Sequence, residues 1–191
     1  MRIIRHRCNT KAEIRAACEA GDDFECDVRF GGHGETHLAH DRGEKVGTYA
    51  CATIVMVLNE YPAAMAFVNP KEGGIVERLV DNLPSEIAAR CVLVDASANE
   101  TRYAEKNSKL KGLNRISLNE YNSTGSGGAW WDYPYRADTK TLFESAIYLV
   151  SPELHGLPLT DGYIEAMVQR REITGVCTDE WDRWRAAINE R

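Results

Sequence analysis

Hydrophobic and polar positions follow two periods in turn along most of the chain. Short apolar runs typical of buried strands are separated by stretches in which apolar residues recur every three or four positions, as on one face of a helix. The pattern predicts eight β segments, at residues 2–6, 24–30, 64–69, 91–95, 113–117, 128–132, 147–150 and 173–177.

Helices are expected between most of these strands. In the first, Thr10 and Glu13 have the spacing of a capping box, in which each side chain bonds the backbone of the other residue. The expected helices cover residues 10–20, 48–58, 75–83, 99–110, 161–170 and 178–188, with a weak helix at 139–143. A segment at 37–41, after a glycine-rich turn, is expected to form a β-hairpin arm with the second strand.

Alternating strands and helices imply a parallel sheet. Eight units favour a compact (β/α)8 TIM barrel, and an open doubly wound sheet is the alternative. Each unit has only about 24 residues, near the lower limit for such a barrel, so some helices must be shortened. The chain shows no linker, and residues 1–191 are interpreted as one domain with a hairpin insertion after the second strand.

The second strand carries an unusual polar face. Period-two alternation places apolar residues on one side and Glu25, Asp27 and Arg29 on the other. Barrel strands are ordinarily apolar on both faces, and two buried carboxylates repel each other and lose hydration. A divalent cation would remove both costs, because hard cations prefer oxygen ligands. The alternative is a half-exposed strand whose carboxylates are neutralised by Arg29.

Other polar residues fall where strands end. His6 and Arg7 follow the first strand, His40 ends the hairpin arm, and Asn69 and Lys71 close the third strand. Active sites of such barrels form at the C-terminal ends of the strands, so these side chains are expected to meet around one mouth. A single histidine is usually structural, whereas two on separate elements favour acid–base chemistry.

Two further residues could line the same mouth. Trp130 shares a strand face with Asp132, and it is expected either to wall the substrate or to pack in the core. His155 follows the seventh strand, and it is expected either to line the site or to cap a turn.

These motifs resemble the glycerophosphodiester phosphodiesterase family. The resemblance rests on H-R-x-N-T at 6–10, E-x-D at 25–27 and H-D at 40–41. The segment F-V-N-P-K at 67–71 is similar to the family's third strand, and G-V-C-T-D at 175–179 is similar to its closing strand. The likeness extends over nearly the whole chain.

The resemblance implies a metal-dependent phosphoric diester hydrolase with a role in lipid metabolism and a small glycerophosphodiester-like substrate. It assigns general acid and base roles to His6 and His40, and phosphate binding to Arg7 and Lys71. The implied ligands of a magnesium or calcium ion are Glu25, Asp27 and Asn69. Asn69 departs from the pattern, because many members have a carboxylate there, and Cys8 stands where the family has glycine.

Composition narrows the possible functions. The 191 residues include 23 Lys and Arg against 29 Asp and Glu, a net charge of −6, which argues against a general nucleic-acid binder. No apolar run approaches the roughly 20 residues of a membrane span, and the first residues lack the apolar core of a signal peptide. The six cysteines form no CxxC pair, so we expect reduced thiols in the cytoplasm. The oligomeric state stays open.

Two other functions stay open. The barrel could bind a phosphorylated ligand without hydrolysing it, an alternative suggested by Asn69 and by the short chain. It could also be a lyase or isomerase that uses His6 and Lys71 for proton transfer.

Overall fold

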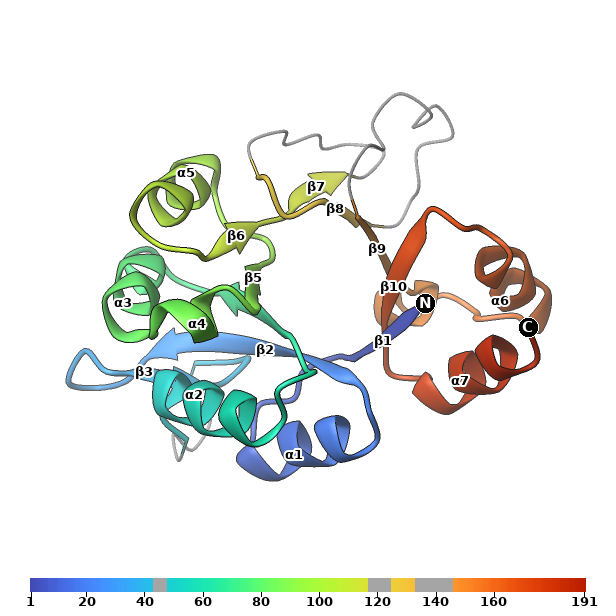
Figure 1. Cartoon of the computed structure of the whole chain (residues 1–191), viewed down its shortest axis with the longest axis horizontal. Coiled ribbons are helices and arrows are strands. Elements are labelled where there is room, and N and C mark those ends of the chain that lie inside the picture. Colours follow the sequence, from blue (N-terminus) through green and yellow to red (C-terminus); the bar gives the residue numbers. More distant parts are fainter. Residues whose placement is uncertain (43–47, 117–124, 133–145) are drawn as a thin grey trace.

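A computed structural model describes residues 1–42, 48–116, 125–132 and 146–191. Within these ranges, nine parallel strands are arranged side by side in the order β6-β5-β4-β2-β1-β10-β9-β8-β7. Their bounds are β1 (Arg2–Arg5), β2 (Asp23–Phe30), β4 (Ala66–Pro70), β5 (Cys91–Leu93), β6 (Lys111–Gly112), β7 (Asn114–Ile116), β8 (Ala129–Trp131), β9 (Ile147–Val150) and β10 (Ile173–Thr178). Figure 1 shows these strands around a common centre, with the helices outside them.

The ring of strands closes at a single segment. Only Leu113 separates β6 from β7, so the two act as one strand that pairs with β5 on one edge and β8 on the other. The Leu113 N–H donates to the Leu93 carbonyl at 2.9 Å, and the Asn114 N–H donates to the Gly128 carbonyl at 2.8 Å. The prediction of a compact barrel is therefore confirmed, and the open sheet is excluded.

The helices are short, as the length per unit requires. They are α1 (Lys11–Glu19), α2 (Ala50–Glu60), α3 (Ile75–Asn82), α4 (Ser85–Ala88), α5 (Ala98–Asn107), α6 (Asp161–Val168) and α7 (Trp181–Asn189), with a 3-10 turn, η2 (Pro152–His155). The capping box of Thr10 and Glu13 is formed, and the sequence pattern missed α4 and η2. The weak helix predicted at 139–143 lies outside the described residues. None of the described helices has the length and apolar composition that a membrane span needs.

The predicted hairpin is also present. Strand β3 (Thr36–Leu38) pairs antiparallel with the far end of β2, with Leu38 opposite Val28. The Ala39 N–H donates to the Asp27 carbonyl at 3.0 Å, which returns the chain to the C-terminal edge of the barrel.

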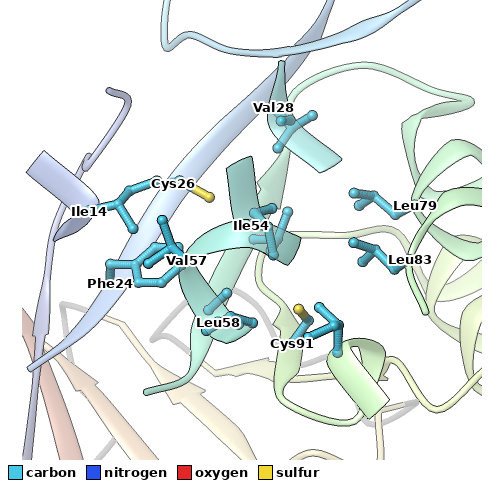
Figure 2. Close-up of a cluster of buried hydrophobic side chains, with 14 of the residues drawn as sticks. Ile14, Phe24, Cys26, Val28, Ile54, Val57, Leu58, Leu79, Leu83 and Cys91 are labelled. Carbon is cyan, nitrogen blue, oxygen red and sulfur yellow. The ribbon is translucent and has the colours of Figure 1, made fainter. Parts of the chain in front are cut away.

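Alternation along the strands divides the apolar core between two sides of the sheet. The larger cluster lies between the strands and helices α1 to α5, and Figure 2 shows part of it, including Phe24, Cys26, Ile54 and Leu79. The six cysteines are free thiols, and five of them are buried, as expected for small core residues.

A second group of apolar side chains fills the inside of the ring: Ile4, Phe67, Val92, Val94, Leu113, Trp130, Tyr148, Val150 and Cys177. The rings of Phe67 and Tyr148 meet edge to face, with centroids 4.9 Å apart. This packing forms an apolar floor beneath the strand ends.

We expect Ile54→Ala to lower the free energy of unfolding by about 2–5 kcal/mol, because Ile54 is fully buried and its loss leaves a cavity. Urea denaturation followed by circular dichroism measures the change. Asn59→Ala, on the exposed side of the same helix, should change it by less than about 0.5 kcal/mol. Equal losses in the two variants would contradict the assignment of this helix face to the core.

Candidate active site

Glu25, Asp27 and Asn69 lie on the inner face of the barrel, above the apolar floor. The pairing of β2 with β4 sets Glu25 opposite Phe67 and Asp27 opposite Asn69. Their exposed fractions are 2%, 1% and 8%. The predicted polar face of the second strand is therefore buried, and the alternative of a half-exposed strand is wrong.

Both oxygens of Asp27 have partners. Lys71 Nζ lies 2.7 Å from Oδ1, and the Asn9 amide donates to Oδ2 at 2.9 Å. The Asp27 N–H in turn donates to Asn9 Oδ1 at 2.8 Å, so the two residues bind each other reciprocally. The sequence identified Asn9 only as part of a motif. The structure shows that its side chain holds Asp27 in place by hydrogen bonds to the carboxylate and the backbone.

Arg29 does not neutralise this pair of carboxylates. Its guanidinium donates to the His40 carbonyl at 2.7 Å and to Glu72 at 2.8 Å. Arg29 therefore connects the end of the hairpin arm to the loop after β4 through these hydrogen bonds.

The turn after β1 holds Glu25. The Arg7 N–H donates to Glu25 Oε2 at 2.8 Å, and the Cys8 N–H donates to the Glu25 carbonyl at 2.8 Å. Arg7 adopts a left-handed backbone with φ of 52°, a conformation that costs a non-glycine residue about 1–3 kcal/mol. Its side chain is exposed and lines a cavity of about 210 Å³ together with His6 and Asp179.

Burial and the neighbouring charge of Asp27 raise the pKa of Glu25 to about 7, while His6, the Arg7 N–H and Lys71 act in the opposite direction. His6 and Lys71 therefore both act on this carboxylate electrostatically. Two buried carboxylates with incomplete compensation form a place where added positive charge is favoured.

His6 contacts a residue that the sequence analysis did not select. Its Nδ1 lies 3.1 Å from Asp179 Oδ1, and the backbone N–H of His6 donates to the Thr178 carbonyl at 3.3 Å. Asp179 directly follows β10. The T-D pair at the end of the predicted closing strand was the sequence feature that could have identified Asp179 as a residue of the mouth. This contact joins the two ends of the chain at the mouth.

His40 reaches the same end of the barrel from the hairpin arm. It follows Ala39, whose N–H bonds the Asp27 carbonyl, and its Nδ1 lies 2.9 Å from Asp41 Oδ1. Its side chain is 28% exposed. The backbone of His40 is thus placed beside the buried carboxylates.

A chain of contacts runs along the other half of the mouth. The Asn69 amide donates to Asp95 at 3.4 Å, and the Arg115 guanidinium bonds Asp95 at 3.1 Å and Asp132 at 2.6 Å. His155 Nε2 lies 2.5 Å from the other oxygen of Asp132. The buried Asp132 therefore holds an arginine and a histidine whose side chains stay about one-third exposed. The sequence analysis had named His155 and Asp132, but not their contact.

Trp130 lies below this rim. It is 5% exposed and packs against Phe67, with ring centroids 6.0 Å apart. It therefore belongs to the apolar floor rather than to a solvent-facing wall.

The donor types of the predicted metal site suit a hard cation. Glu25 and Asp27 offer carboxylate oxygens as ligands. The amide nitrogen of Asn69 donates to Asp95, so its carbonyl oxygen is the atom that could serve as a third ligand. Lys71 takes one coordinating position on Asp27. Within the described ranges there is no group of three His, Cys, Asp or Glu side chains placed to hold a metal.

We expect Glu25→Gln to stabilise the protein increasingly as pH rises. Because the folded-state pKa of Glu25 is raised from 4.5 to about 7, its ionisation favours the unfolded chain, and wild-type stability is lost as pH rises through about 7. Glutamine cannot ionise, so the difference in unfolding free energy should grow by about 1–3 kcal/mol between roughly pH 5 and pH 8. Urea titrations in the presence of a chelator measure it, with the exposed Glu86→Gln as control. A difference that stays constant with pH would contradict this electrostatic picture.

Comparisons with solved structures agree with this architecture. A glycerophosphodiester phosphodiesterase from Agrobacterium tumefaciens is 14% identical, with 97% of this chain and 99% of that chain covered and a TM-score of 0.64. A glycerophosphoryl diester phosphodiesterase from Parabacteroides distasonis is 12% identical, with 99% and 86% covered and a TM-score of 0.70. No protein-family model matches the sequence, and no curated protein matches it either.

The predicted resemblance is therefore present at the level of three-dimensional structure. At this low identity the likeness concerns the fold. The chain has the same barrel fold as solved glycerophosphodiester phosphodiesterases, in a compact and divergent form.

Proposed function

We propose that this protein is a metal-dependent phosphoric diester hydrolase that acts on a small glycerophosphodiester-like substrate in the cytoplasm. The observation that carries the proposal is the meeting of His6, Glu25, Asp27 and Lys71 at the C-terminal end of the barrel. The names of the structural neighbours support the same reaction class.

Phosphate recognition falls to Arg7 and Lys71. A phosphodiester is an anion and gains negative charge in its transition state, so fixed positive groups stabilise that state. The exposed Arg7 side chain lies at the entrance, and the ammonium of Lys71 is held over Asp27. When bound at Glu25, Asp27 and Asn69, a divalent cation would supply further positive charge to the phosphoryl oxygens.

His6 and His40 transfer the protons. One imidazole accepts the proton of the attacking hydroxyl, which belongs to water or to a neighbouring group of the substrate, and the other protonates the leaving alkoxide. Each has a carboxylate on Nδ1, Asp179 for His6 and Asp41 for His40. For His6, this contact makes Nε2 the atom for proton exchange.

Ligand binding without hydrolysis is the second candidate function. With Asn69 in place of a carboxylate, the proposed cation site has one formal negative charge fewer. The ammonium of Lys71 already pairs with Asp27 Oδ1. Both features lower the affinity for a cation, which favours a barrel that recognises a phosphorylated ligand only.

We expect His6→Ala and His40→Ala each to lower kcat by about 100- to 10,000-fold, because each removes a proton-transfer group. Hydrolysis of bis(p-nitrophenyl) phosphate and of glycerophosphodiesters measures the loss. His33→Ala, on the exposed hairpin turn, is the matched control and should retain full activity. Unchanged turnover in both active-site variants would exclude the proposed roles. Phosphate binding without turnover in the wild type would favour the second candidate.

We expect Asn69→Asp to strengthen cation binding, because it restores a carboxylate beside Asp27. The rise in Tm on adding Mg²⁺ or Ca²⁺ should be larger in the variant than in the wild type, and the cation concentration for half-maximal activity should be lower. Asn82→Asp, at the exposed end of α3, is the control. Cations and chelators that change neither Tm nor activity in either protein would exclude the metal site.

A further inference from the structure

A column of polar groups connects the core beneath α7 to the mouth of the barrel. The indole N–H of Trp184 donates to Ser151 Oγ at 3.2 Å, and the Ser151 hydroxyl donates to Glu153. The other oxygen of Glu153 accepts the Thr178 hydroxyl. Trp184, Ser151 and Thr178 are fully buried, so each of these polar atoms needs its partner inside the protein.

The column ends on the backbone that carries Asp179. The Asp179 N–H donates to Glu153 at 3.3 Å, and the Glu180 N–H donates to the Thr178 hydroxyl at 2.9 Å. Strand pairing sets Arg5 opposite Thr178, so His6 and Asp179 directly follow the ends of two adjacent strands. The backbone on both sides of the His6–Asp179 contact is therefore fixed.

We propose that Asp179 is a positioning residue for His6, and that Glu153 keeps it in place. A carboxylate on Nδ1 only accepts hydrogen bonds, so neutral His6 carries its proton on Nδ1 and presents Nε2 as a proton acceptor. In the proposed reaction, neutral His6 can then accept a proton at Nε2, as a general base does. This role rests on the proposed function, whereas the tautomer does not.

The effect of Asp179 on His6 can be separated from a contribution of the ion pair to the stability of the fold. Asp179 is 61% exposed, and exposed ion pairs contribute little to stability. Removing its carboxylate should leave the fold intact, so an effect on the His6 ring or on turnover can be separated from unfolding.

The test is Asp179→Ala, with the tautomer of His6 measured by long-range ¹H–¹⁵N NMR in histidine-labelled protein at about pH 8.5, above the ordinary imidazole range. His6→Gln assigns the signal. In the wild type we expect the Nδ1–H form to dominate, and in Asp179→Ala a shift toward the Nε2–H form. The kcat should fall about 10-fold or more, with KM changed less than about twofold. Asp182→Ala, an exposed acidic residue in the first turn of α7, is the matched control.

Two further variants sharpen the result. Asp179→Glu should restore part of the Nδ1–H population, and Glu153→Gln should give an intermediate population because it weakens the hold on the Asp179 backbone. An Asp179→Ala protein with the tautomer and kcat of Asp182→Ala would overturn the inference, while loss of activity in His6→Ala would still support the proposed hydrolase. A shifted tautomer with full turnover in His6→Ala would support the positioning contact and exclude the proposed reaction.

Discussion

Glu25 and Asp27 lie two residues apart on the inner face of β2, where they are 2% and 1% exposed. Charges in such a place are tolerated only with partners, because burial removes their hydration. The Asn9 amide, the Arg7 N–H and the ammonium of Lys71 supply those partners. The turn after β1 and the end of β4 are therefore both organised around this pair of carboxylates.

The rest of the barrel makes this arrangement possible. Phe67, Trp130 and Tyr148 pack inside the ring as part of an apolar cluster. An eight-unit barrel is just wide enough for such side chains to fill it. The polar groups of the mouth lie at the C-terminal ends of the strands, close enough to act on one another.

Asn69 links the two halves of the mouth. It lies opposite Asp27 in the strand register and donates to Asp95, which begins the chain of contacts through Arg115 to Asp132. The mouth thus has His6 and His40 on one side and a row of paired charges on the other. The amide nitrogen of Asn69 makes this connection.

Local patterns in the sequence were enough to predict the strand–helix order, the inner face of β2, the hairpin arm and the α1 capping box. Each of these depends on residues a few positions apart, where a period of two or 3.6 is a direct consequence of backbone geometry. The sequence patterns did not predict that Asp179 contacts His6, that Asn9 rather than Arg29 binds Asp27, or that residues 111–116 close the ring. These contacts depend on strand register and on turns that bring distant residues together, and no local periodicity encodes them.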